Sequence, residues 1–198
     1  ALLRWLHPQQ GLITPTTFIP LAEKSGLIIE IGTWVLQEAC RQAVQWQQAG
    51  LPPLLMSVNL SPVQVRRAGI EQVVLDALAD SGLAADQLEL ELTESMLIDD
   101  SDGLTQLLGR LRERGVGIAI DDFGTGYSNL GYLKRFAVER LKIDQSFIRH
   151  LSEDGDNEVI VRAIIQMAHS LKLMTVAEGI EDAATLARLS ELGCDRGQ

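Results

Sequence analysis

The sequence predicts an α/β fold, a TIM-like (β/α)8 barrel that is incomplete in this chain. Short apolar runs alternate with amphipathic stretches from about residue 54 onward, and each run ends in polar residues. No glycine-rich dinucleotide fingerprint follows any of the runs. This alternation predicts parallel strands joined by right-handed crossovers, and the number of repeats favours a closed barrel over an open sheet, which remains the alternative.

Five segments are predicted to be strands, because each is short, apolar and bounded by polar or turn residues. In chain order they are 54–60 (LLMSVNL), 88–92 (LELEL), 116–120 (VGIAI), 140–143 (RLKI) and 175–177 (TVA). A complete barrel needs about 250 residues. We therefore expect the first strand and the last helix of a barrel to lie outside these 198 residues.

Five helices are predicted around these strands, because apolar residues recur there every three to four positions. Several begin near Asp, Asn or Ser, and glycine follows four of them, at positions 50, 82, 115 and 193. The predicted helices are 31–49, 69–81, 102–114, 157–171 and 182–192.

The composition predicts one globular domain over residues 1–198, with 46% hydrophobic residues and no low-complexity stretch. The formal net charge of -10 argues against a DNA- or RNA-binding protein. No uncharged apolar run reaches the roughly 18 residues of a membrane span, so we expect no direct membrane insertion. Cys40 and Cys194 are expected to be buried free thiols, which suits a reducing cytoplasm.

Polar or charged side chains follow nearly every predicted strand. In a barrel these strand ends converge on one mouth, where such side chains form a site. For any single strand, capping of the next helix is the stronger interpretation of these residue types, and only their recurrence over several strands favours a site. The residues are Asn59, Glu91, Glu94, Asp121, Asp122, Lys142, Asp144, Glu178 and Glu181.

The adjacent Asp121 and Asp122 give the clearest indication of a metal site. Two carboxylates so close together repel each other unless a proton or a cation lies between them. Carboxylate and amide ligands without His or Cys favour Mg²⁺ or Mn²⁺ over zinc. Lys142, inside an apolar strand, is interpreted as binding a phosphate or a water, with a buried ion pair as the alternative.

Other residue types are interpreted as structural. The three histidines, His7, His150 and His169, fall outside the strand ends and are expected to be surface or structural residues. Trp5, Trp34 and Trp46 are expected in the core or between helices. The glycine-rich segment after Asp122 is predicted to be a mobile loop beside the metal ligands.

Eight motifs resemble the EAL domain family in order and spacing, over all 198 positions. They are ALLRW, FIPLAEKSGLI, VNLSP, ELTES, DDFGTGYSNL, LKIDQSFI, AEGIE and DRGQ. The resemblance implies a barrel that hydrolyses cyclic di-GMP to the linear dinucleotide pGpG with two Mg²⁺ or Mn²⁺ ions. By the same resemblance, the glutamate that gives the family its name would immediately precede Ala1.

The resemblance also implies roles for individual residues. The implied metal ligands are Asn59, Glu91, Asp121, Asp122 and Glu178, with Asp121 bridging both ions. Lys142 matches the lysine near the attacking water, and with Asp121, Asp122 and Glu178 it forms the implied catalytic set. Glu94 matches the glutamate that steadies the DDFGTGYSNL loop. Substrate-side positions are matched by Arg4, Asp144, Glu181 and Gln198.

Three functions follow from these inferences. The first is two-metal hydrolysis by in-line attack of water on a phosphodiester of cyclic di-GMP. The second is a catalytically inactive receptor for the same ligand, and the third is a metal-dependent barrel enzyme that acts on a sugar phosphate or carboxylate. The resemblance further implies a homodimer, flanking sensory or GGDEF-type domains, and a cytoplasmic location, possible also for a membrane-anchored protein.

Overall fold

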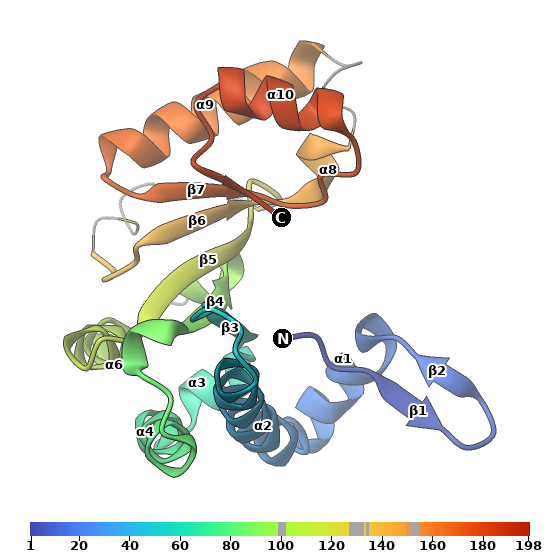
Figure 1. The fold of residues 1–198 in the computed structure, drawn as a ribbon, viewed down its shortest axis with the longest axis vertical. Coiled ribbons are helices and arrows are strands. Elements are labelled where there is room, and N and C mark those ends of the chain that lie inside the picture. The colour runs from blue at the N-terminus through green and yellow to red at the C-terminus, as the bar shows by residue number, and fades with distance from the viewer. Residues whose placement is uncertain (99–101, 127–132, 134, 150, 152–154) are drawn as a thin grey trace. The chain divides into compact units, whose positions relative to one another are not determined.

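A computed structural model describes residues 1–98, 102–126, 133, 135–149, 151 and 155–198 of the chain. The chain divides into two compact units. The first unit comprises Ala1–Glu91 and Arg110–Gly117, and the second comprises Leu92–Gly109 and Ile118–Gln198. Figure 1 labels the helices and strands of both units.

The first unit begins with an antiparallel hairpin and continues with helices around the start of a parallel sheet. Strand β1 (Trp5–His7) pairs with β2 (Gly11–Ile13), and the parallel pair β3–β4 follows later in the chain. The other elements are α1 (Pro15–Ser25), α2 (Ile28–Gln48), β3 (Met56–Asn59), α3 (Pro62–Arg66), α4 (Ile70–Ser81), η1 (Ala85–Gln87), the first four residues of β4 (Leu88–Thr93) and the end of α6 (Asp102–Glu113).

The core of the first unit is built by helical periodicity. In α2, Leu36, Ala39, Cys40 and Ala43 recur at the spacing of one helical face, and all four are buried. This face packs against α4, where Val74 is fully buried. Burial raises the pKa of the Cys40 thiol to about 11, which makes this cysteine a packing residue with an unreactive thiol.

The second unit contains the rest of the parallel sheet and the helices that cover it. Helices α9 and α10 lie on the same side of β6 and β7 (Figure 1), and α9 contacts both strands. The elements are the end of β4, α5 (Glu94–Ile98), the first part of α6, β5 (Gly117–Phe123), β6 (Arg140–Ile143), α8 (Gln145–Ile148), α9 (Gly155–Ser170), β7 (Met174–Ala177), α10 (Ala183–Glu191) and β8 (Arg196–Gly197).

The sheet topology confirms the predicted fold class. The strands follow one another in chain order, β3-β4-β5-β6-β7-β8, and the pairs β3–β4, β5–β6, β6–β7 and β7–β8 are parallel. Chain-order adjacency of parallel strands joined by helices is the connectivity of a TIM-like barrel, and an open doubly wound sheet would reverse its order. Six strands are present in this sheet among the described residues, in agreement with an incomplete barrel.

The ten predicted elements are present, most with shifted ends, and the structure adds elements that were not predicted, namely β1, β2, α1, α3, η1, α5, α8 and β8. Helix α2 begins at Ile28, three residues before the predicted start, and β3 is confined to Met56–Asn59. The larger difference is in β5, which continues through Asp121 and Asp122 to Phe123. The predicted strand ended at Ile120 because the apolar run ends there. In the structure, pairing with β6 continues past the two charged residues to Phe123.

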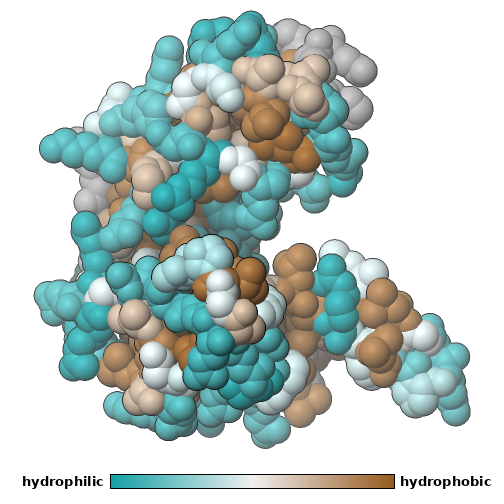
Figure 2. Space-filling view, in the orientation of Figure 1, coloured by the Kyte–Doolittle hydropathy of each residue, from teal (hydrophilic) through white to brown (hydrophobic). Residues whose placement is uncertain are grey.

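The prediction that the tryptophans lie in the core is wrong. Trp5, Trp34 and Trp46 are 44%, 55% and 39% exposed. Trp5 and Trp34 line an apolar hollow of 620 Å³ in the first unit, together with Phe18 and Leu27. In Figure 2, brown side chains gather around α1 and the N-terminal hairpin. An aromatic residue at helical spacing marks an apolar face, but the spacing does not say whether another element covers it.

Candidate active site

Three carboxylates of the second unit form a compact cluster. Ligand oxygens of Asp121, Asp122 and Glu178 all lie within 4.8 Å of one another. Asp121 and Asp122 belong to β5, and Glu178 directly follows β7, two strands away in the sheet. The cluster therefore lies where the predicted convergence of strand ends would place it.

A bulge in β5 explains how two consecutive residues contribute to one cluster. Successive side chains of a regular strand point to opposite faces. Between Ile120 and Phe123 the register with β6 shifts: Phe123 is three residues after Ile120, but its partner on β6 is only two residues after the partner of Ile120. This extra residue in β5 is a β-bulge. Asp122 has a φ of 54°, in the left-handed region that non-glycine residues rarely adopt. The irregular backbone brings both carboxylates together.

Lys142 supplies a buried positive charge to the cluster. Its Nζ lies 3.2 Å from Oδ1 of Asp121 and forms an ion pair with Glu178. The side chain is 6% exposed, so these interactions operate with little screening by water. Lys142 is therefore a buried ion-pair partner, the second alternative in the sequence interpretation, and it lies beside the candidate metal ligands. Its binding of a phosphate or a water stays a prediction.

The electrostatics of the cluster favour a cation. Burial, repulsion from Asp121 and Asp144, and a hydrogen bond with Asp144 raise the pKa of Asp122, and the positive charge of Lys142 opposes them. One ammonium group does not neutralise this set of carboxylates. Oxygen donors with excess negative charge suit a hard divalent cation, so the residues fit the metal that their sequence pattern predicts.

Asn59 and Glu91, two further predicted metal ligands, are hydrogen-bonded to each other in the first unit. They are register partners in the parallel ladder of β3 and β4, and Nδ2 of Asn59 donates a hydrogen bond of 2.9 Å to Oε2 of Glu91. Glu91 is buried. One layer earlier, Ser57 donates a hydrogen bond of 2.8 Å to the buried Glu89.

Glu94, the first residue of α5, contacts the start of the predicted mobile loop. Its Oε2 accepts a hydrogen bond of 3.1 Å from the backbone N–H of Gly124, two residues after Asp122. A buried carboxylate thus fixes the first turn of the segment. The remainder of the predicted loop, residues 127–129, lies outside the described residues.

The four predicted substrate-side residues lie in different surroundings. Arg4, in the first unit, lines the apolar hollow and donates to the carbonyl of Leu3 at 2.8 Å. In the second unit, Asp144 caps α8 by accepting from the N–H of Ser146 at 2.9 Å. Glu181 is exposed, as is Gln198, whose backbone N–H donates to Ala177.

The structure also identifies polar residues that the sequence interpretation missed. Glu89 shares a strand face with Glu91, and the alternation in LELEL could have revealed this. Asp195 accepts hydrogen bonds from both the N–H and the hydroxyl of Thr175, and it pairs with His169 at 2.9 Å. No sequence motif predicted the latter cluster, because its members come from separate elements.

Comparisons with known proteins agree with the motif resemblance. The sequence profile described as "EAL domain" matches residues 1–198. MucR of Pseudomonas aeruginosa, named a bifunctional diguanylate cyclase and cyclic di-GMP phosphodiesterase, is 50% identical over 195 residues, which are 98% of this chain and 28% of MucR. NbdA of the same organism, named a cyclic di-GMP phosphodiesterase, is 46% identical over 195 residues, covering 98% of this chain and 25% of NbdA.

A solved structure supports the same relationship. The phosphodiesterase of MucR in complex with c-di-GMP superposes with a TM-score of 0.93 at 50% identity, covering 98% of this chain and 78% of that one. The chain spans about a quarter of the length of the curated relatives MucR and NbdA. Among the described residues, no helix is both long enough and apolar enough to span a bilayer.

Proposed function

This chain belongs to the EAL domain family, and from that premise we propose that it hydrolyses cyclic di-GMP to linear pGpG. The observation that carries the proposal is the cluster of Asp121, Asp122 and Glu178 around the buried ammonium of Lys142. The names of MucR and NbdA support the assignment of the substrate. We propose Mg²⁺ or Mn²⁺ as the cofactor, with two ions in the complete site.

Each residue of the proposed site has a role that its chemistry supports. The cluster carboxylates would hold metal, and the family resemblance assigns Asn59 and Glu91 of the β3–β4 pair to metal binding as well. When bound, divalent ions lower the pKa of an attacking water and offset charge on the phosphoryl oxygens. Lys142 would orient that water or stabilise the charge that develops on the phosphoryl group.

We assign the remaining residues to the substrate and to the loop. The planar guanidinium of Arg4 can bind a phosphate through two parallel hydrogen bonds. Asp144, Glu181 and Gln198 are assigned to the substrate side of the site. Glu94 is assigned to the first turn of the loop, in keeping with its hydrogen bond to Gly124. A homodimer and flanking sensory or GGDEF-type domains remain predictions for the protein.

The alternative function is a receptor that binds cyclic di-GMP without cleaving it. Such a receptor has no need of a complete set of metal ligands. All five implied ligands that fall within this chain are carboxylates or amides of the required type, and three of them cluster. This retention favours the enzyme over the receptor.

The test is incubation of the purified protein with cyclic di-GMP and Mg²⁺, followed by chromatography for pGpG. We expect turnover by the wild-type protein and loss of more than about 90% of the rate in Asp122→Asn at saturating Mg²⁺. Loss of a metal ligand should cost more than about 1.4 kcal/mol of transition-state stabilisation, which is the equivalent of one tenfold loss in rate. Asp80→Asn, on the exposed surface of α4, is the matched control and should retain activity.

Two results would contradict the proposal. Binding of cyclic di-GMP without formation of pGpG would support the receptor instead. Retention of more than a tenth of the wild-type rate by Asp122→Asn would remove this residue from the catalytic set.

A further inference from the structure

The short helix α8 contacts both turns that carry the clustered carboxylates. It follows β6, the strand of Lys142, and its N-cap residue is Asp144, whose carboxylate accepts a hydrogen bond from Ser146. Its last residue, Ile148, is fully buried, and the helix packs against α9 (Figure 1). The helix is therefore anchored to the body of the second unit and presents Gln145 and Phe147 to the neighbouring turns.

The first contact is between Phe147 and the turn after Asp122. A methyl group built onto Gly124 would lie 2.9 Å from Cε2 of Phe147 and 3.3 Å from Cδ1 of Ile164. Gly124 thus faces the edge of the aromatic ring, with too little space between them for a side chain. The N–H of Gly124 also donates a hydrogen bond to Glu94. The ring and the carboxylate together limit where this turn can lie.

The second contact is between Gln145 and the turn after Glu178. A methyl group built onto Gly179 would lie 2.8 Å from Cβ of Gln145 and 3.6 Å from its Cα. Gly179 has a φ of 74°, which favours glycine, and the turn leaves no room for a side chain against Gln145. Arg149, which follows α8, also lies 3.8 Å from Glu181 in the same loop.

We propose that α8 is a strut that sets the separation of the two metal-binding turns, with Phe147 and Gln145 as its positioning residues. Phe147 fixes the turn of Asp121 and Asp122 through Gly124, and Gln145 fixes Glu178 through Gly179. Neither side chain needs to touch the metal or the substrate. The inference rests on the proposed function, because it assumes that the cluster binds metal.

The physical reason for such a strut is the irregularity of the ligand backbone. Asp122 is in a left-handed conformation beside a bulge, a geometry that persists only where the surroundings enforce it. The repulsion among the carboxylates also acts to separate the turns when metal is absent. A packed helix opposes this separation, as supporting contacts around metal ligands generally do.

The decisive experiment measures the affinity for Mn²⁺, from the electron paramagnetic resonance signal of free Mn²⁺. Loss of a supporting contact typically weakens metal binding 10- to 100-fold. For Phe147→Ala we expect a loss of about tenfold, together with a higher Mn²⁺ concentration at half-maximal rate. Phe147→Leu, which keeps part of the packing, should recover part of the affinity and covers the case in which the alanine variant fails to fold.

A matched pair of substitutions tests the second contact. Gln145→Ala keeps the Cβ atom that packs against Gly179, whereas Gln145→Gly removes it. We expect Mn²⁺ binding to be several-fold weaker in Gln145→Gly than in Gln145→Ala. Equal affinities in the two variants would show that the Cβ contact does not position Glu178.

A core variant separates positioning from general destabilisation. Leu189 of α10 is 2% exposed and belongs to neither turn. Leu189→Ala should lower the melting temperature while leaving the Mn²⁺ affinity unchanged. A folded Phe147→Ala protein with wild-type Mn²⁺ affinity would overturn the strut. In contrast, a wild-type protein that neither binds Mn²⁺ nor cleaves cyclic di-GMP would overturn the proposed function.

Discussion

At the scale of single residues, the site depends on side chains whose partners lie far away in the sequence. Lys142 lies between two apolar residues of its strand, and the fold pairs it with Asp121 and Glu178. Asp195 is similar, because its hydrogen-bond partners come from β7 and from the end of α9. For both residues the sequence shows the chemical group, and the tertiary structure shows which partners it binds.

Asp195 allows a prediction of pH-dependent stability. Burial by itself raises the pKa of Asp195, but hydrogen bonds from the Thr175 N–H, the His169 ring and the Thr175 hydroxyl outweigh it and leave the pKa below its ordinary value. A carboxyl whose pKa is lower in the folded state stabilises the protein above its unfolded pKa, about 3.9. That contribution is lost as the pH falls through the folded pKa.

The comparison of wild-type protein with Asp195→Asn tests this prediction. We expect the wild-type protein to have the higher free energy of unfolding at pH 7, and the difference to shrink progressively below about pH 4. Urea denaturation at a series of pH values measures the difference. A gap that is the same at pH 7 and at low pH would show that the charge of Asp195 contributes no stability.

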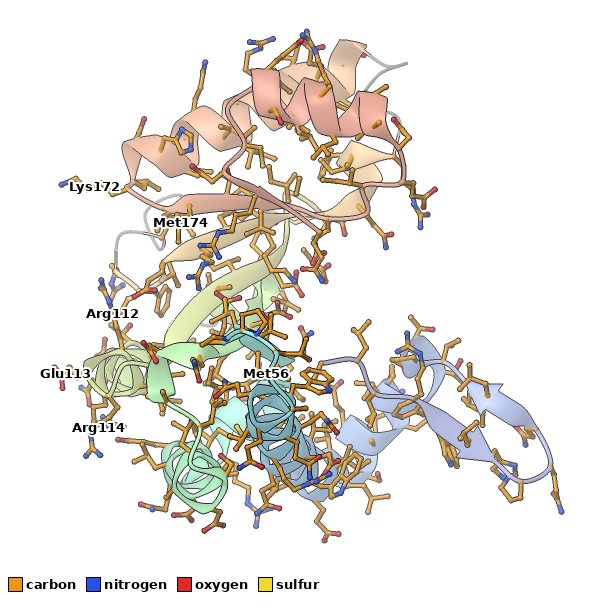
Figure 3. The ribbon with its side chains drawn as sticks, in the orientation of Figure 1. Met56, Arg112, Glu113, Arg114, Lys172 and Met174 are labelled. Carbon is orange, nitrogen blue, oxygen red and sulfur yellow. The ribbon has the colours of Figure 1, made fainter. Side chains whose placement is uncertain are left out.

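At the scale of elements, the departures from regular geometry carry most of the information. The bulge in β5 brings the carboxylates of Asp121 and Asp122 together. Helix α8, with only four residues, contacts the turns after Asp122 and Glu178. The third departure is Lys172, in the turn between α9 and β7, with a φ of 61°. Figure 3 shows its side chain directed away from the sheet, beside Met174 at the start of β7.

Lys172 gives a prediction about stability. A left-handed conformation costs a residue with a Cβ atom about 1–2 kcal/mol, whereas glycine adopts it readily. Lys172→Gly should therefore stabilise the protein by up to about 1 kcal/mol, after allowing for the greater freedom of glycine in the unfolded chain. Lys172→Ala is the control and should bring no such gain, because alanine keeps the Cβ atom. Chemical denaturation of both variants decides the question, and a less stable Lys172→Gly protein would contradict the argument.

At the scale of the whole molecule, negative charge and the acidic cluster couple stability to metal. The formal net charge is -10, and the cluster concentrates carboxylates that repel one another. A ligand that binds only the folded state stabilises it, by about 2.7 kcal/mol at one hundred times its dissociation constant. For a chain of this size that corresponds to a rise of roughly 5 to 10 °C in melting temperature.

We therefore expect Mn²⁺ to raise the melting temperature of the wild-type protein and a chelator to reverse the rise. Asp122→Asn should lose most of the effect, while the surface variant Asp80→Asn should keep it. Thermal melts with and without Mn²⁺ provide the measurement. An equal rise in wild-type protein and Asp122→Asn would place the bound ion somewhere other than the cluster.

Sequence alone determined the class of fold, the alternation of five of its strands with five of its helices, and the chemical groups available to the site. Apolar periodicity depends on local geometry, so runs such as 116–120 and the buried face of α2 could be recognised without tertiary information. The motif order likewise identified the family, and the aspartate pair indicated a metal site.

Only the tertiary structure decided how those groups face one another. Alternation along a regular strand would separate Asp121 from Asp122, and a bulge with a left-handed residue brings them together. The sequence also did not predict the exposure of Trp34 or the contacts of α8 with Gly124 and Gly179. The physical reason is that local patterns specify which face of an element is apolar, whereas packing between distant segments determines what that face meets.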